Sequence, residues 1–369
     1  MSMFGTKQHK YTRTRTTRLF SPFLIFLVIL CLASNLAWAK NDDDDDDDDD
    51  DRSGRRGVCS QTAKFLSDAC NKEVQNDYFK ARAICLNVLD TEEHSQCNVE
   101  ATTTRNENQQ LCRAQRTARL DVCKAIGEDR YEPNFAPDLF ETDFANLPQL
   151  NPYLPLAIGN QWGYAGGEET IKIEVLNETK LIEGVTCIVV RDQVSIDGDL
   201  HEDTDDWFCQ AKNGDVYYGG EEVKDFESFD GDNSRRPELV SIDGSFKHGR
   251  DGDKGGILFF MSPIPGQVCR QEFSVATAED VAEVLSITYS FGANPDLDRF
   301  VPQNLAELLC SSGNCVVTKE YSPIEPETVE RQYYTPGIGV FLEVNLDTGE
   351  TVQLVNCNFD SRCPALSNS

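Results

Sequence analysis

Apolar and polar residues alternate with a period of two through most of the chain after Asn151. Thr170 to Val175 follows this alternation strictly, which is typical of a half-buried β-strand. Asp197-Gly198 and Asn213-Gly214 offer hairpin turns between neighbouring runs. Consecutive hairpins predict an antiparallel β meander that closes as a barrel, with a β-sandwich as the alternative. The later strands are predicted at 239–247, 256–261, 267–274, 282–290, 315–321, 328–334, 338–344 and 350–355.

A helical pattern precedes this β region. The stretch from Val58 to Lys124 is nearly free of Gly and Pro and is rich in Ala, Arg, Gln, Glu and Leu. These are helix formers without breakers, so we predict two long helices. The break is expected near Asp90-Thr91-Glu92, where Asp90 or Thr91 can cap the second helix.

The spacing of six cysteines predicts how the two helices pack. Three nested pairs have residue numbers with the same sum, 182: Cys59 with Cys123, Cys70 with Cys112, and Cys85 with Cys97. In an antiparallel hairpin folded about residue 91, residues with a constant sum lie level with each other. Spacings of 11 and 15 residues keep the three cysteines of each helix on one face. The sequence therefore predicts a hairpin stapled by three disulfides, which replace a core that two helices are too small to build.

The first 39 residues have the order of a secretory signal peptide: basic residues, an apolar run from Pro22 to Ala33, then Ala37-Trp38-Ala39. That run is shorter than the roughly 20 residues of a membrane span, so we expect cleavage after Ala39 and no span. Ten consecutive Asp residues follow, at 42–51. Such a run repels itself and predicts a solvated leader, with weak calcium binding as the alternative.

These patterns divide the chain into six segments. We expect a signal peptide at 1–39, a disordered poly-Asp leader at 40–56, the helical hairpin at 57–126, a Pro- and aromatic-rich linker at 127–150, the β domain at 151–356 and a tail at 357–369. The resulting fold class is α+β. Export to the periplasm or cell surface suits this design, because disulfides persist outside the reducing cytosol.

Net charge and motif content narrow the chemistry. A formal charge of −29 repels phosphate backbones, which excludes nucleic acid as a partner. No GxSxG, HExxH or Walker-type motif occurs, and no cofactor is implied. The weak metal candidates are His201, Asp203 and Asp205, which share one face of a predicted strand, although an exposed solvated face explains them as well. Asp230-Gly231-Asp232-Asn233 and Asp251-Gly252-Asp253 resemble fragments of calcium loops, but turn chemistry explains both.

Seven cysteines and several aromatic residues of the β domain and tail leave alternatives open. Cys357 with Cys363 is the best local pair, clamping the tail. Cys209 with Cys269 and Cys187 with Cys315 could bridge strands, and Cys310 with Cys315 is the alternative; the odd number leaves one thiol unpaired. Aromatic residues that could line a pocket, or pack in the core, are Trp162, Tyr164, Trp207, Tyr217, Tyr218, Tyr333 and Tyr334.

Several stretches resemble a family of secreted bacterial proteins of unknown function. They are Asn151 to Leu156 followed by Gly159, Trp162 and Tyr164; Val185-Thr186-Cys187; Asp206-Trp207; and Tyr333 to Gly339. The cysteine-bearing hairpin is also similar to members of that family. The resemblance covers most of residues 57–356 and implies a bacterial origin and the same two-part build, but it carries no activity.

The function predicted from the sequence is therefore that of an exported, non-enzymatic binding or scaffold protein whose ligand, a small molecule or a protein, is unknown. A carboxylate-dependent hydrolase is one alternative, since scattered Asp and Glu could assemble a site. A calcium-responsive surface or matrix protein is the other.

Overall fold

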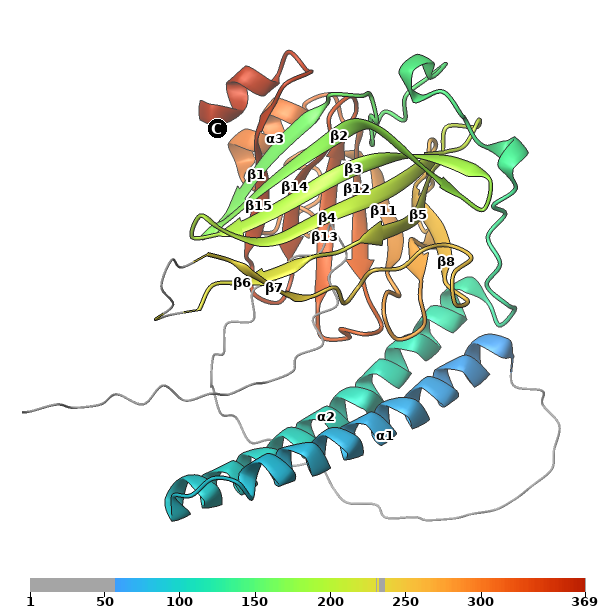
Figure 1. Ribbon diagram of the computed structural model, residues 1–369. Coiled ribbons are helices and arrows are strands. Elements are labelled where there is room, and N and C mark those ends of the chain that lie inside the picture. Colours follow the sequence, from blue (N-terminus) through green and yellow to red (C-terminus); the bar gives the residue numbers. More distant parts are fainter. Residues whose placement is uncertain (1–56, 230, 232–235, 369) are drawn as a thin grey trace, which may run out of the picture.

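The computed structural model of the protein describes residues 57–229, 231 and 236–368, and it begins with a long helical hairpin beneath a curled β-sheet (Figure 1). The hairpin consists of α1 (Val58–Cys85) and α2 (Thr91–Ile126). The predicted signal peptide, the Asp42–Asp51 run and most of the 230–233 motif lie outside the described residues. No helix in the described part of the chain is long and apolar enough to cross a membrane.

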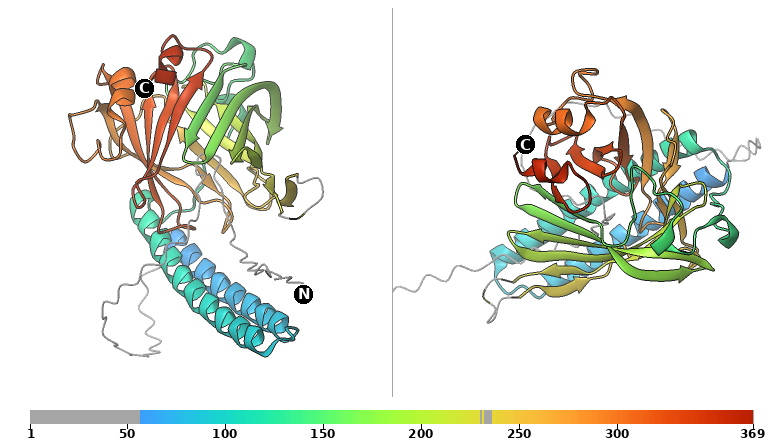
Figure 2. Two further views of the ribbon diagram at one scale, coloured as in Figure 1. Left: turned by 90° about the vertical axis from the view of Figure 1, so that its left-hand side faces the viewer. Right: turned by 90° about the horizontal axis from the view of Figure 1, so that it is seen from above.

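The predicted disulfide-stapled antiparallel hairpin is confirmed. Disulfides join Cys59 to Cys123, Cys70 to Cys112 and Cys85 to Cys97, with Cα atoms 5.5–5.8 Å apart. Asp90 caps α2, because its Oδ1 accepts hydrogen bonds from the backbone N–H groups of Glu92 and Glu93. The hairpin projects away from the sheet as a rod, and only its open end reaches the β domain (Figure 2).

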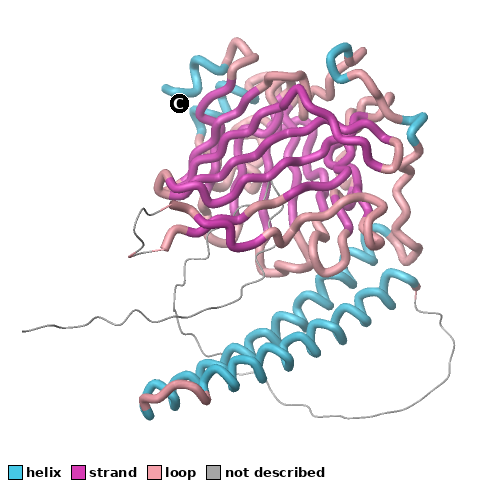
Figure 3. The backbone as a smooth tube through the Cα atoms, viewed as in Figure 1, coloured by secondary structure: helices cyan, strands magenta, loops and turns pink. Residues whose placement is uncertain are grey.

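The β domain is a single, nearly closed antiparallel sheet, which confirms the barrel-like meander rather than the sandwich (Figure 3). Its strands follow the sheet order β10-β8-β5-β4-β3-β2-β1-β15-β14-β13-β12-β11-β9, with β6 and β7 attached beside β4. Their bounds are β1 Gln161–Gly166, β2 Glu169–Ile182, β3 Val185–Ile196, β4 Asp199–Gln210, β5 Val216–Glu222, β6 Asp225–Glu227, β7 Glu238–Ser241, β8 Lys254–Phe259, β9 Val268–Arg270, β10 Glu272–Phe273, β11 Val281–Tyr289, β12 Cys315–Tyr321, β13 Val329–Thr335, β14 Gly339–Asn345 and β15 Thr351–Cys357.

One short segment, 268–273, closes the sheet. Its first half, β9, pairs with β11, and its second half, β10, pairs with β8 at the other edge of the sheet. Only Gln271 separates the two halves. The segment therefore forms a seam that pairs with part of each edge strand, Lys254 and Gly255 of β8 and Val281–Glu283 of β11, and so shortens the edges open to edge-to-edge association.

The predicted linker is ordered along the outside of the barrel. It contains two short 3₁₀ helices, η1 (Pro137–Leu139) and η2 (Phe144–Asn146). Phe135 and Phe140 are buried against an outward-facing cluster on β2, β3 and β4 that includes Ile182 and Trp207. The main apolar core fills part of the barrel interior and continues under α3 (Gln303–Cys310) and η3 (Cys363–Asn368).

Several local predictions were wrong. Asn213-Gly214 does lie in the predicted hairpin turn between β4 and β5, but the turn is longer than two residues, since the Ala211 N–H donates to the Asp215 carbonyl across it. The expected strand at 239–247 is only four residues long, and that at 267–274 is split at the seam. Helix α3 was not expected. Asp197-Gly198 does form the predicted tight turn, with both residues at positive φ, 53° and 84°.

The cysteines of the β domain pair differently from two of the expectations. Cys187 is joined to Cys209 across β3 and β4, and Cys310 to Cys315. The pairs Cys209–Cys269 and Cys187–Cys315 are therefore wrong, since the partner of a strand cysteine depends on which strands become neighbours. Cys357 and Cys363 are joined, and Cys269 is the free cysteine of the described residues. Six disulfides indicate an oxidising compartment.

Candidate ligand-binding site

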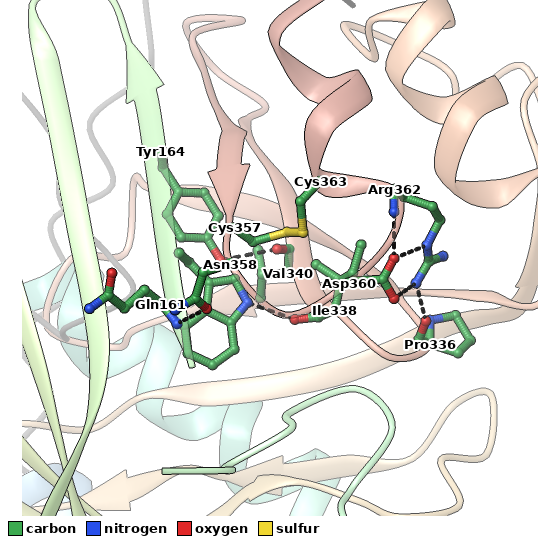
Figure 4. Close-up of a disulfide and its surroundings, with 11 residues drawn as sticks. Gln161, Tyr164, Pro336, Ile338, Val340, Cys357, Asn358, Asp360, Arg362 and Cys363 are labelled. Carbon is green, nitrogen blue, oxygen red and sulfur yellow. Dashed lines mark hydrogen bonds and ion pairs between the residues drawn. A yellow bond between two sulfur atoms is a disulfide. The ribbon is translucent and has the colours of Figure 1, made fainter. Parts of the chain in front are cut away.

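The stretches around Trp162 and around Ile338, which both carry the family resemblance, meet at one end of the barrel and form structural contacts (Figure 4). Cys187 and Trp207, from two other such stretches, lie instead in the outward-facing cluster that packs on the linker. The Trp162 indole N–H donates to the carbonyl of Ile338 at 2.7 Å, and the Tyr164 hydroxyl donates to the carbonyl of Val340 at 3.0 Å. The tail closes over this region through the Cys357–Cys363 disulfide and through Arg362, which donates to Asp360 and to the carbonyl of Pro336. These contacts hold the tail and the strands together at this end of the barrel.

The weak metal candidates lie on one half-exposed face of β4, as the alternation predicted. The Asp203 carboxylate is paired with Arg191, whose Nε donates to Oδ1 at 2.7 Å. Asp253 of the predicted turn accepts a hydrogen bond from the Ser274 hydroxyl at 2.7 Å. Among the described residues, no group of three or more His, Cys, Asp or Glu side chains is arranged to hold a metal ion.

The opposite face of β4 turns acidic residues into the barrel. Together with acids from other strands they form a set that we call the carboxylate belt: Glu169, Asp192, Glu202, Asp206, Glu221, Glu272, Glu320, Glu330 and Glu343. Each is at most 8% exposed. Burial, and then neighbouring acids that include Glu343 on β14, raise the pKa of Asp192 on β3. Three strands separate β3 from β14 in the sheet, so the belt spans the interior.

Neutral donors satisfy only part of the belt. The Tyr218 hydroxyl donates to Asp206 at 2.5 Å, and the Gln332 amide donates to Glu343 at 3.0 Å. Neither carboxylate oxygen of Glu330 has a hydrogen-bond partner within the described chain. Burial therefore raises the pKa of these groups, to about 8 for Glu202 and Glu320, with neighbouring acids adding to the shift. The belt is a set of acids whose protonated form burial favours.

A pocket of about 590 Å³ lies where the hairpin, the linker and the barrel seam meet. The hairpin contributes the open ends of both helices, the linker contributes residues 129–134, and the barrel contributes β5, β8 and the seam. Its walls are mainly apolar, through Leu66, Ile126, Ile257, Phe260 and Phe273. An apolar hollow of this size with a few polar groups is the usual form of a small-molecule site.

Arg119 connects the hairpin to the barrel at this pocket. Its Nε and Nη2 donate to the two carboxylate oxygens of Glu279 at 2.8 and 3.0 Å, and both side chains are almost completely buried. Glu279 also accepts the backbone N–H of Ala276. The third nitrogen of the guanidinium, Nη1, has no hydrogen-bond partner among the described residues.

Arg270, on the seam, is the second buried cation of the pocket. It is 5% exposed, and its Nε and Nη1 have no partner in the described part of the protein. The guanidinium lies over the ring of Phe273 at 4.4 Å and near that of Tyr131 at 5.7 Å. Burial lowers its pKa, but an arginine stays protonated at physiological pH. The pocket therefore contains a permanent charge with free donors.

The backbone around Arg270 is held by Tyr131. The tyrosine hydroxyl lies 3.2 Å from the carbonyl of Gly255 and 3.4 Å from that of Arg270. A Cβ atom on Gly256 would stand 2.1 Å from the Arg270 carbonyl oxygen, so only glycine permits this approach. Cys269 also lines the pocket, and burial raises the pKa of its thiol, which stays neutral. A neutral thiol is a poor nucleophile.

Sequence reasoning missed both arginines. Of the aromatic candidates, Tyr217 lines this pocket, whereas Trp162, Tyr164, Tyr218, Tyr333 and Tyr334 pack in the main core and Trp207 in the outer cluster. One signal was available: Arg119 follows Cys112 by seven residues and precedes Cys123 by four, which places a charge beside the cysteine-bearing face of its helix. Arg270 offered no comparable signal.

Neither a protein-family model nor a curated protein matches the chain significantly. Two solved structures show weak similarity. A protein from Parabacteroides distasonis ATCC 8503, provisionally named a lipoprotein, has 10% identity and a TM-score of 0.28, covering 57% of this chain and 100% of its own. A protein from Bacteroides fragilis NCTC 9343, provisionally named an exported protein with a YmcC-like fold, has 9% identity and a TM-score of 0.25, covering 55% and 96%. Likeness at this level carries no argument about function.

Proposed function

We propose that the protein is an exported, non-enzymatic binding protein that holds a small molecule in the pocket between the hairpin and the barrel. The observation that carries this proposal is the pocket itself, an apolar hollow with buried cationic groups that three separate parts of the chain assemble. In this view the disulfides keep the rod-like hairpin in place as one wall of the site. The exported, bacterial character implied by the family resemblance is consistent with this role.

The hydrolase alternative is less well supported. General acid and base catalysis needs carboxyl groups within reach of a substrate. The carboxylate belt is buried, and burial favours its protonated form. The calcium alternative depends on the Asp42–Asp51 run, outside the described residues, and Asp203 and Asp253 are engaged by protein groups instead.

A neutral fluorescent probe tests the pocket. N-phenyl-1-naphthylamine should bind the protein, and Thr62→Trp should weaken binding about 10-fold, because an added indole occupies space that the apolar probe needs. Thr62 lines the pocket and is half-buried, whereas Lys64 is exposed and lies off it. Lys64→Trp is therefore the matched control and should bind as the wild type does. Equal binding by both variants would contradict the proposal and favour a scaffold role.

A further inference from the structure

We propose that the pocket selects an amphipathic monoanion, a carboxylate attached to an apolar chain or ring, and that Arg270 binds the carboxylate. This inference rests on the proposed function and specifies the chemistry of its ligand. The observation that supports it is that Arg119 and Arg270, two residues that line a mainly apolar pocket, have buried guanidinium donors without hydrogen-bond partners in the described residues.

The unpaired donors are the first argument. Nε and Nη1 of Arg270 and Nη1 of Arg119 are buried and make no hydrogen bond within the described residues, and both arginines are among the residues that line the pocket. A buried donor that loses water without gaining a partner is costly, and more so when it is charged. An anion in the pocket would supply acceptors to these donors, and hydrogen bonds between charged partners are among the strongest available to a protein.

The charge balance is the second argument. The charged residues that line the pocket comprise four cations and three acids, in a chain whose formal charge is −29. Glu279 is neutralised by Arg119 and Glu132 by Lys254. The remaining charges are those of the buried Arg270 and of two exposed residues of opposite charge, Asp129 and Arg130. One buried positive charge is left, which a single carboxylate balances.

The walls give the third argument. The Arg270 guanidinium lies over Phe273, so one of its faces is covered and a ligand must approach from an edge. Leu66, Ile126, Ile257 and Phe260 supply apolar surface in the same pocket. A small inorganic anion would leave this surface in contact with water. A ligand with both a carboxylate and an apolar body uses both parts of the pocket.

The test compares dodecanoate with 1-dodecanol, which share a chain and differ in charge. Calorimetric titration of the full exported chain near neutral pH should show dodecanoate binding about 10-fold more tightly than the alcohol, because hydrogen bonds to charged groups are stronger than neutral ones. Arg270→Met keeps the length and apolar contacts of the side chain and should remove that preference. Arg130→Met makes the same charge change at an exposed residue on the pocket rim and should preserve it.

Each outcome decides between the two proposals. If dodecanol binds the wild-type protein as tightly as dodecanoate, the carboxylate inference is overturned while the binding function stands. The same holds if N-phenyl-1-naphthylamine binds but dodecanoate does not. If none of the three binds, the proposed function itself fails. A preference that survives Arg270→Met, in a variant with wild-type circular dichroism, also overturns the role of Arg270.

Discussion

Arg119 on α2 forms a bidentate ion pair with Glu279, which lies just before β11, and this pair links the hairpin to the barrel. Both charges are withdrawn from water, so each depends on the other for compensation. Breaking such a pair by removing one partner costs about 3–5 kcal/mol, whereas replacing both costs much less.

A double-mutant cycle should show this dependence. Arg119→Met and Glu279→Met are each expected to destabilise the protein by about 3 kcal/mol, and the double variant by clearly less than the sum. Urea unfolding followed by circular dichroism provides the measurement. Gln115→Ala is the control, because it removes a single hydrogen bond to the carbonyl of Ile324 and should cost about 1 kcal/mol. Additive costs at positions 119 and 279 would contradict the pair's role.

The fold of the hairpin should depend on its three disulfides more than the fold of the barrel depends on the disulfides of the β domain. Substituting its six cysteines by Ser should abolish most of the helical circular dichroism signal, because Phe65, Phe79, Leu86 and other apolar side chains remain exposed and few are buried between the helices. In the chain-entropy model the Cys70–Cys112 closure alone contributes about 4 kcal/mol. The control is Cys357→Ser with Cys363→Ser, which should leave the helices intact. Retained helix in the six-Ser variant would refute the stapling argument.

Stability should fall as the pH rises from about 5 to 9. Burial raises the pKa of Glu202 and Glu320 from an ordinary 4.5 to about 8, and that of Glu169 to about 7. The folded state therefore binds more protons than the unfolded state between these values. The contribution of these groups is fully present below about pH 4.5 and is lost as the pH passes through 7 to 8.

Glu320→Gln tests the origin of that pH dependence. The amide keeps an acceptor for the Thr318 hydroxyl, which donates to Glu320 Oε1, and cannot ionise. The variant should gain about 4 kcal/mol over the wild type at pH 9 relative to pH 5, since about three pKa units lie between pH 5 and the raised pKa of about 8 and each unit corresponds to about 1.4 kcal/mol. Glu350→Gln, at an exposed position on the loop before β15, is the control and should leave the thermal melting profile unchanged.

The exported protein should begin at Lys40. Mass spectrometry of the protein recovered from its host would show loss of residues 1–39, because Ala37-Trp38-Ala39 has the small-x-small form of a signal-peptidase site.

Deleting Asp42–Asp51 should not change the melting temperature in calcium-free buffer, since a self-repelling run buries no apolar surface. A large drop in melting temperature would contradict this expectation, and an unprocessed N-terminus would contradict the predicted cleavage.

Local regularity made part of this protein predictable. The turn at Asp197-Gly198 follows from two residues that tolerate positive φ, and the pairing of Cys59 with Cys123 follows from helical periodicity and chain symmetry. The face shared by His201, Asp203 and Asp205 follows from the period of a strand. Each of these depends only on residues close in sequence, or on a geometry that repeats without change along an element.

Only the tertiary structure decided which face of each strand turns into the barrel and which residues pack against that face. Alternation assigns Glu202 and Asp206 to one face of β4, but only the curling of the sheet makes that face the interior, where burial raises the pKa of both acids. Cys187 pairs with Cys209 because β3 and β4 become neighbours, which leaves Cys269 free beside Arg270. The pocket arises where α2 meets the barrel, and Arg119 and Glu279, which join the two there, are 160 residues apart along the chain. Contacts of that range depend on the packing of whole elements, which no local pattern encodes.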